Sequence, residues 1–273
     1  MNRNEFSNIK SLVVKVGTST LSYKNGRLNF LRMEKLAQVL SAISSRGIKV
    51  TLVTSGAIGV GAGRLFLTEK PKELAKKQAL AAIGQAQLIK IYQKFFDHYN
   101  QLVAQVLLTK DVMTIVNRHH NAQNTLLKLL DMGIIPIINE NDTIATDEIE
   151  FGDNDTLSAM VATLIQADLL ILLSDIDGLY SADPKKDSTA RIIRSVPEIT
   201  SSIEILAEGS GSSFGTGGMV TKIAAAKITS KAGIDMVLAQ GDEPSLMFDI
   251  LEGKEVGTHF MANKSVGASQ VRI

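Results

Sequence analysis

Several absences narrow what this protein can be. The 273 residues include no cysteine, which excludes disulfides, thiolate catalysis and cysteine-based zinc or iron–sulfur sites and fits a reducing compartment. Lys and Arg total 29 against 28 Asp and Glu, a net charge of +1, so no basic excess favours a nucleic-acid or anionic-membrane partner. Apolar stretches such as 169–173 fall far short of the roughly 18 residues that cross a bilayer, and residues 1–10 lack the apolar core of a signal peptide. We expect a cytoplasmic protein with no nucleic-acid partner and no membrane contact.

The pattern of apolar residues predicts an α/β protein. A length of 273 residues suggests one large domain or two small ones, and neither a Pro/Ser-rich linker nor an internal repeat divides the chain. Short β-branched runs alternate with stretches of helical period, which is typical of parallel strands joined by crossover helices. Strands are predicted at 12–16, 48–54, 102–109, 134–139, 169–173 and 235–239, a hairpin strand at 143–150, and helices at 30–45, 73–99, 121–132, 156–166 and 219–232. We expect a single domain, a three-layer α/β/α sandwich with a central, mostly parallel sheet that collects ligands at the carboxyl ends of its strands.

Glycine-rich turns follow the first two predicted strands. The first reads Lys15-Val16-Gly17-Thr18-Ser19, where backbone N–H groups near a glycine and a lysine charge suit a phosphate. The second reads Thr54-Ser55-Gly56-Ala57-Ile58-Gly59 and suits a small anion such as an α-carboxylate. Neither completes a Walker A loop or the dinucleotide glycine fingerprint, which weakens both of those interpretations. A plain strand-to-helix turn remains the alternative for each.

Two clusters of carboxylates and carboxamides flank the predicted hairpin strand. Asn139-Glu140-Asn141-Asp142 follows the fourth strand, and Gly152-Asp153-Asn154-Asp155 opens a helix. Such clusters bind an ammonium group, orient lysines or hold Mg²⁺ through phosphate and water. Each alone could be a turn or a helix cap, but the two together favour a functional site.

The C-terminal half holds two further candidate segments. Ser174 and Asp175 follow a buried strand and could hold a ribose or an adenine edge, although the Asp177-Gly178 pair alone would also make an ordinary turn. The glycine-rich segment 211–222 delivers Lys222 into the first turn of a helix. A lysine there opposes the helix dipole unless an anion binds, so the arrangement favours a polyphosphate site over a plain flexible loop. His119 and His120 are adjacent rather than one helical turn apart, so we expect no metal site.

Taken jointly and in this order, these motifs resemble the amino acid kinase family over nearly the whole chain. Within it they resemble the members that phosphorylate the γ-carboxylate of L-glutamate, the first step of proline biosynthesis. The resemblance implies that Lys15 and Lys222 contact the ATP phosphates and that Asp155 organises these two catalytic lysines. It implies that Ser55, Asp142 and Asn154 bind glutamate. The other implied nucleotide contacts are Ser174, where the family has threonine, and Asp175, Thr216, Gly217, Gly218, Met219, Val220 and Thr221.

The resemblance carries further expectations. It implies ATP with Mg²⁺, an amino-acid site in an N-terminal lobe at roughly 1–165, and a nucleotide site in a C-terminal lobe at roughly 166–273. It implies a homo-oligomer, dimer or tetramer, and proline as feedback inhibitor. Many relatives continue into a PUA domain where this chain ends at Ile273, so we expect none. Alternatives are acetylglutamate, aspartate, carbamate or UMP kinase activity and a catalytically dead amino-acid sensor. A dinucleotide-dependent dehydrogenase shares the α/β pattern but needs the glycine fingerprint that this chain lacks.

Overall fold

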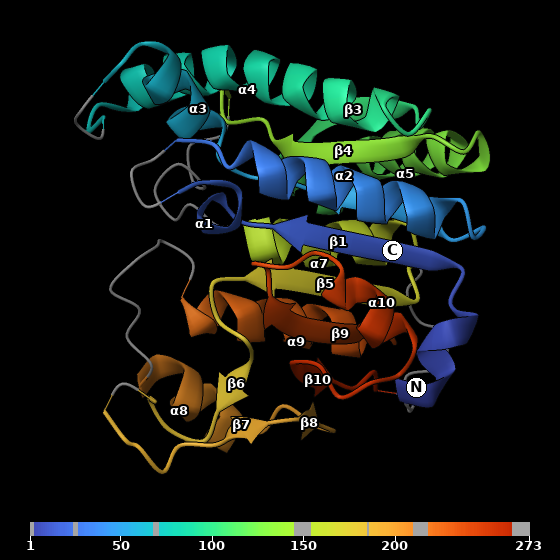
Figure 1. The fold of residues 1–273 in the computed structure, drawn as a ribbon, viewed down its shortest axis with the longest axis vertical. Coiled ribbons are helices and arrows are strands. Elements are labelled where there is room, and N and C mark those ends of the chain that lie inside the picture. The colour runs from blue at the N-terminus through green and yellow to red at the C-terminus, as the bar shows by residue number, and fades with distance from the viewer. Residues whose placement is uncertain are drawn as a thin grey trace.

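A computed structural model describes residues 3–23, 27–67, 71–144, 154–184, 186–209 and 218–263. Its main sheet has eight strands in the order β3-β4-β2-β1-β5-β9-β10-β8 (Figure 1). In that order they are Val103–Leu108, Ile135–Glu140, Lys49–Val53, Ser11–Val16, Leu169–Ser174, Asp235–Gln240, Thr258–Phe260 and Ser195–Val196. Within the described sheet only β9 and β10 pair antiparallel, so the predicted mostly parallel sheet is confirmed.

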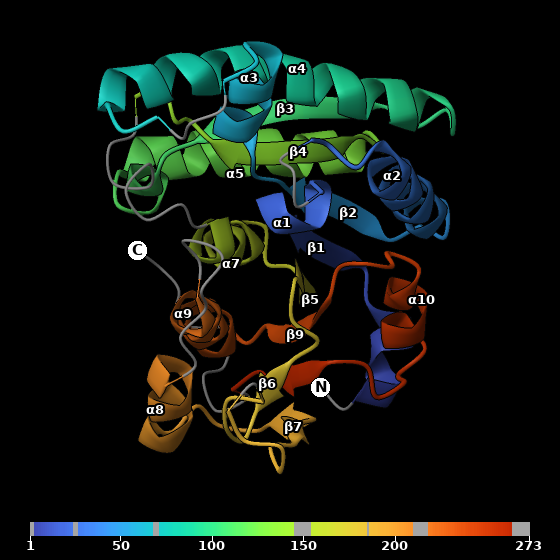
Figure 2. The ribbon, with the colours of Figure 1, turned by 60° about the vertical axis from the view of Figure 1, so that its left-hand side comes forward.

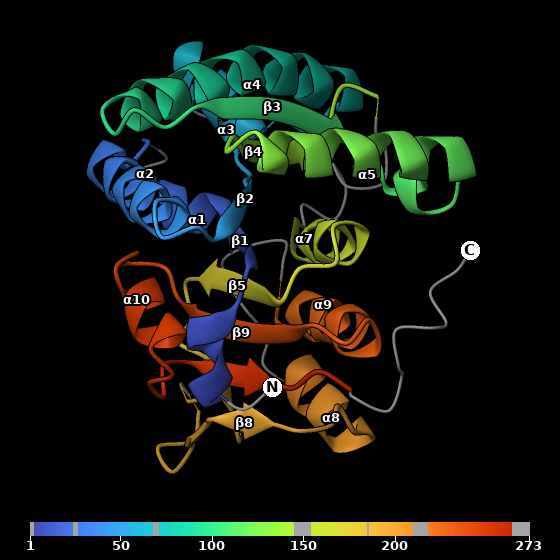
Figure 3. The same ribbon diagram turned by 90° about the vertical axis from the view of Figure 1, so that its right-hand side faces the viewer.

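Helices cover both faces of this sheet. Figure 3 shows α2 (Phe30–Ser44) and α10 (Leu246–Leu251) on one side of the strands and α5 (Val116–Asp131), α7 (Asn154–Leu164) and α9 (Met219–Lys231) on the other. The long helix α4 (Leu74–Asp97) packs Leu88, Tyr92, Phe95 and Phe96 into the same apolar cluster as α2 and α10. The predicted three-layer α/β/α sandwich is therefore confirmed.

Alternating strand residues supply the two apolar layers. In β1, Leu12 and Val14 join the cluster that contains α2, whereas Val13 joins the cluster that contains α7 and α9. This follows from the strand itself, because successive side chains point to opposite faces of a sheet. Strands buried on both faces need continuous apolar runs, and β5 is buried at every position. The central strands therefore read as short hydrophobic runs in the sequence.

The predicted helices and strands lie close to their observed positions. In α2, the Asn29 side chain caps the helix by accepting a hydrogen bond from the Arg32 N–H at 3.1 Å. Gly47 ends the segment with φ of +85°, a conformation that favours glycine. The largest difference is in α5, which begins at Val116 rather than at residue 121. The predicted hairpin strand at 143–150 lies outside the described residues from 145 onward, and Thr143 and Ile144 form part of a turn.

Several short elements carry no clear periodicity and appear only in the structure. They are η1 (Arg3–Asn8), α1 (Thr18–Leu21), α3 (Ala57–Arg64), η2 (Lys110–Met113), α8 (Ser201–Gly209), α10, the β6 (Leu179–Tyr180) and β7 (Ile192–Ile193) pair, β8 and β10. Helix α8 ends at Gly209, two residues before the glycine-rich segment 211–222 begins. Among the described residues, no helix is both long and apolar enough to cross a membrane.

The glycine-rich α3 is a helix because it packs directly on α4. A Cβ at Gly61 would lie 2.0 Å from the Leu80 carbonyl oxygen, and a Cβ at Gly84 would lie 1.7 Å from the Ala57 carbonyl oxygen. Only glycine allows the two backbones to approach this closely. Gly61 of α3 and Gly84 of α4 therefore serve the close packing of these two helices.

Candidate functional site

The carboxyl ends of four adjacent parallel strands bring the predicted residues to one edge of the sheet. The strands β4, β2, β1 and β5 are neighbours in this order. Lys15 lies near the end of β1, Ser55 follows β2, Asp142 follows β4, and Ser174 ends β5. The first turns of α7 and α9 add Asn154, Asp155 and Lys222, and these two helices lie side by side (Figure 2).

Two lysines from opposite halves of the chain meet at one carboxylate. The Lys15 ammonium lies 2.5 Å from Asp155 Oδ1, and the Lys222 ammonium lies 3.1 Å from Asp155 Oδ2. Thr221 Oγ1 donates a third hydrogen bond, to Oδ2 at 3.0 Å. Lys15 is 8% exposed, Lys222 5% and Asp155 1%. The structure thus brings three predicted catalytic residues and one predicted nucleotide contact into a single buried cluster.

The lysines keep Asp155 ionised. Burial by itself raises the pKa of this carboxyl group, but the attraction of Lys15 and Lys222 outweighs burial and holds the pKa well below its usual range. A carboxylate that stays ionised orients both ammonium groups toward one point. Nearby phosphate oxygens would meet two preorganised cations rather than two mobile side chains.

The start of α9 explains the unusual position of Lys222. The helix begins at Met219 after Gly218, and its first turn contains no acidic residue. The partial positive charge of a helix N-terminus disfavours a lysine in the first turn, and the contact with Asp155 offsets this cost. The partial positive charge of the helix N-terminus and Lys222 together suit an anion.

Asn154 is hydrogen-bonded to residues at the carboxyl ends of β2 and β4. It is 5% exposed, and its Nδ2 donates to the Thr54 carbonyl oxygen at 2.5 Å and to Asn139 Oδ1 at 2.7 Å. A carboxamide nitrogen has two donor hydrogens, so both are used within the protein. The Oδ1 atom is what Asn154 can offer to a ligand.

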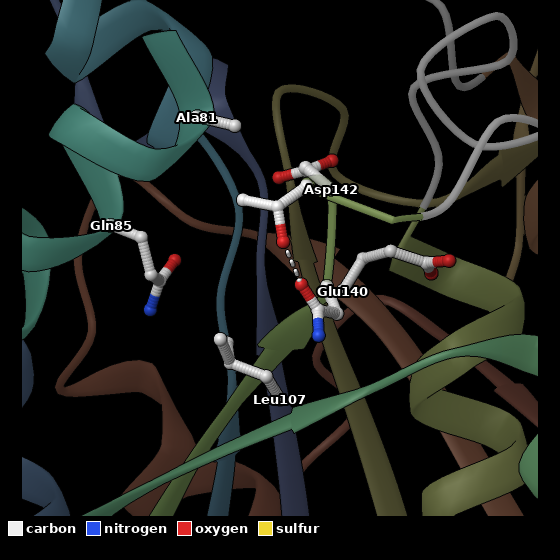
Figure 4. A pocket seen from close by; sticks show the side chains of 7 residues that line it. Ala81, Gln85, Leu107, Glu140 and Asp142 are labelled. Atoms are coloured by element: carbon white, nitrogen blue, oxygen red, sulfur yellow. Dashed lines mark hydrogen bonds between the residues drawn. The ribbon is translucent and has the colours of Figure 1, made fainter. Parts of the chain in front are cut away.

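Asp142 lines a small pocket beside this cluster. The lining residues come from α4, from β3 and from the segment that ends β4: Ala81, Gln85, Leu107, Glu140, Asn141, Asp142 and Thr143 (Figure 4). Burial raises the pKa of Asp142 to about 6. A bound ammonium group would supply the missing positive charge, so the pocket suits a cationic group.

The remaining predicted residues that the structure describes lie around the same edge of the sheet. Ser55 is half-buried, and the next residue, Gly56, has φ of +96° and opens α3. The Ser174 hydroxyl donates to Asp175 Oδ1 at 3.0 Å. Met219 is buried and Val220 is 53% exposed. Thr216 and Gly217 lie outside the described residues.

Two polar residues at the site were not predicted as site residues. Asn139, 2% exposed, joins Asn154 to Gln85, which is 8% exposed and reaches the site from α4. Asn139 belongs to an acidic cluster visible in the sequence. Gln85 has a weaker signal, which is a polar side chain on the otherwise apolar face of a helix that buries Ala81 and Leu88.

Comparisons with known proteins agree on one family and one fold. The model of the amino acid kinase family matches residues 10–240. The chain is 53% identical to the glutamate 5-kinase of Clostridium perfringens, and the alignment covers 96% of this chain and 99% of that relative. It is 51% identical to the glutamate 5-kinase of Listeria monocytogenes, with 96% of each covered, and 52% identical to that of Carboxydothermus hydrogenoformans, with 96% of this chain but 70% of that relative covered.

Two solved structures share the fold at low identity. The UMP kinase from Bacillus anthracis has a TM-score of 0.63 at 17% identity, covering 93% of this chain and 97% of that chain. The UMP kinase from Ureaplasma parvum has a TM-score of 0.64 at 16% identity, covering 91% and 97%. These likenesses concern the architecture of the sheet and its helices.

Proposed function

We infer that this chain, which belongs to the amino acid kinase family and within it to the glutamate 5-kinases, transfers the γ-phosphoryl group of ATP to the γ-carboxylate of L-glutamate. The products are L-glutamyl 5-phosphate and ADP, and the reaction is the first step of proline biosynthesis. The observation that carries this inference is the convergence of the Lys15 and Lys222 ammonium groups on Asp155. It is the arrangement that phosphoryl transfer between two anions needs.

The reaction needs charge neutralisation rather than a base. The γ-carboxylate of glutamate is ionised at neutral pH, so no proton has to be removed before it attacks the γ-phosphorus in line. The barrier comes from bringing two anions together and from charge on the transferring oxygens. An ammonium group 4 Å from such an oxygen contributes about 4 kcal/mol at an effective dielectric of 20. Lys15 and Lys222 supply this charge, and Asp155 positions them.

ATP binds as its Mg²⁺ complex. Phosphate oxygens and water are the ligands that Mg²⁺ prefers in such substrates. Ser174 and Asp175 at the end of β5 contact the nucleoside, and segment 216–222 contacts the phosphates. We place the amino-acid site in the N-terminal lobe, at roughly 1–165, and the nucleotide site in the C-terminal lobe, at roughly 166–273.

Asp142, Ser55 and Asn154 bind the amino acid. Asp142 pairs with the α-ammonium group, which offsets the cost of burying its carboxylate. N-acetylglutamate has no such cation and would leave Asp142 buried without a counter-charge. The pocket therefore favours an amino acid with a free amine.

We also propose proline as a feedback inhibitor, the cytoplasm as the setting and a homo-oligomer, dimer or tetramer, as the assembly. The edge strand β3 supports the last of these. Leu102, Leu107 and Met132 near this edge are 66%, 36% and 61% exposed, and an open edge with apolar side chains favours association.

A coupled ADP-release assay tests the function. We expect ADP release with L-glutamate that exceeds release with L-aspartate, N-acetylglutamate, carbamate or UMP, and inhibition of that release by proline. A preference for another acceptor would refute the substrate assignment. Glutamate binding without any ADP release would instead indicate a catalytically dead sensor.

A further inference from the structure

A buried chain of carboxamides leads away from the proposed glutamate site. Asn154 Nδ2 donates to Asn139 Oδ1 at 2.7 Å, and Asn139 Nδ2 donates to Gln85 Oε1 at 2.7 Å. The three side chains come from α7, β4 and α4 and are 5%, 2% and 8% exposed. These hydrogen-bonded carboxamides therefore join three separate elements inside the protein.

Backbone groups determine how each amide is oriented. The Thr54 carbonyl oxygen needs a donor, so it faces the Nδ2 of Asn154. The Glu140 N–H needs an acceptor and donates to Asn139 Oδ1 at 2.9 Å. The Nδ2 of Asn139 is consequently left to face Gln85. Because Nδ2 is a donor, the Gln85 atom that faces it is the acceptor Oε1. The remaining polar atom of Gln85 is then a donor, Nε2.

Gln85 Nε2 is buried and has no hydrogen-bond partner among the described residues. A buried donor without an acceptor is costly. Gln85 lines the pocket together with Glu140 and Asp142, and Figure 4 shows Gln85 on the α4 side of it and Asp142 on the side of the segment that ends β4. The unpartnered donor is therefore carried by a residue that lines the same pocket as Asp142.

The packing of α4 sets the position of this donor. Gly84, the preceding residue, lies against the Ala57 backbone so closely that a Cβ would be 1.7 Å from its carbonyl oxygen. This contact restricts the rotation of α4 about its axis and its distance from α3 at Gln85. The donor is thus held by rigid structure on both sides, by helix packing and by Asn139.

We propose that Gln85 Nε2 donates a hydrogen bond to the α-carboxylate of the amino-acid substrate. This rests on the proposed function, in which Asp142 in the same pocket pairs with the α-ammonium group. The α-ammonium and α-carboxylate groups share one carbon atom, so a ligand whose cation reaches Asp142 places its α-carboxylate nearby. Gln85 then selects for an α-amino acid, because a ligand without the carboxylate leaves the donor unsatisfied.

Two substitutions separate this role from a structural one. Gln85→Met removes both polar atoms, whereas Gln85→Glu keeps an oxygen for Asn139 and replaces the donor by a second oxygen. KM for L-glutamate and KM for ATP are measured at pH 8 for both variants and for the wild type. Gln93→Met, the same substitution at an exposed position of α4, is the matched control, and thermal unfolding shows that each variant is folded.

We expect KM for L-glutamate to rise about 10- to 100-fold in Gln85→Met, the usual effect of losing a hydrogen bond to a charged group. It should rise further in Gln85→Glu, where a carboxylate faces a carboxylate, while KM for ATP stays within about twofold in both. A Glu variant that binds glutamate as well as the Met variant, or better, would show that Gln85 only holds Asn139 and would overturn the proposal. If only the Glu variant folds, an unchanged KM overturns it.

The proposed function is judged first, on the wild type. No ADP release with L-glutamate would refute that function and leave Gln85 to be judged by calorimetric titration of L-glutamate. The same order of affinities, wild type above Met above Glu, supports the Gln85 proposal in that case. Absence of glutamate binding to the wild type would overturn both.

Discussion

Replacement of Lys222 by methionine tests the proposed role of the lysine cluster most directly. The side chain is 5% exposed, and its ammonium lies 3.1 Å from Asp155 Oδ2. Methionine has a similar unbranched shape but no charge, so the substitution removes the cation with little change in packing. Asp155 keeps Lys15 at 2.5 Å as its partner, so we expect the variant to fold.

The loss in rate follows from the missing charge. One ammonium near a transferring phosphoryl oxygen contributes about 4 kcal/mol at a dielectric of 20. If about 3 to 4 kcal/mol of this acts only in the transition state, kcat falls by roughly 100- to 1000-fold. KM for glutamate should change little, because Lys222 lies on the proposed nucleotide side.

Initial rates at varied ATP and glutamate measure both parameters. The control is Lys227→Met on the same helix, where the ammonium pairs with Glu204 Oε1 at 2.7 Å and the side chain is 39% exposed. This surface pair contributes at most about 1 kcal/mol to stability, so its kcat should match the wild type. A Lys222→Met enzyme with unchanged kcat and an altered KM for glutamate would refute the phosphoryl-transfer role.

Three further predictions concern pH and packing. The pKa of Asp142 is raised to about 6 by burial, so its carboxylate is available above that pH and protonated below it; KM for glutamate should rise about tenfold per pH unit below 6, and a flat profile between pH 5 and 8 would contradict the ammonium contact. The lowered pKa of Asp155 stabilises the fold fully above the ordinary carboxyl pKa, near 4, and less as the pH falls; the difference in urea-unfolding free energy between wild type and Asp155→Asn should therefore shrink from pH 5 to pH 3. Gly84→Ala should lower the unfolding free energy by about 1 to 3 kcal/mol or more, because the added Cβ clashes with Ala57. Gly59→Ala is the control: its Cβ meets nothing within 4 Å, so it should raise the unfolding free energy by about 0.5 to 1 kcal/mol. Similar urea midpoints for these two variants would count against the close packing of α3 on α4.

Much of the fold could be predicted from local patterns. The run that forms β5 and the helical period of α2, with its Asn29 cap, depend on residues close together in the chain. The short strand β10 and the helix α3 could not be predicted this way. The three residues of β10 show too little periodicity, and the glycines of α3 disfavour a helix until α4 packs against it.

The candidate site also has features that could be predicted from the sequence and features that could not. Each motif could be located from its residue types, because glycine turns and acidic amide clusters at strand ends indicate ligand binding before any contact is known. Gln85 could not be connected to Asn139 and Asn154, since these residues lie on three elements whose spacing depends on packing.

The amino-acid sequence alone therefore determined which segments are strands and helices and which residue types end the central strands, because period and turn chemistry are local properties. Only the tertiary structure decided that Lys15 and Lys222 meet at Asp155 and that Gln85 has a donor left over beside Asp142. Those distances depend on the order of the strands and on the approach of α3 to α4. Both result from the burial of apolar surface between segments that are far apart in the chain.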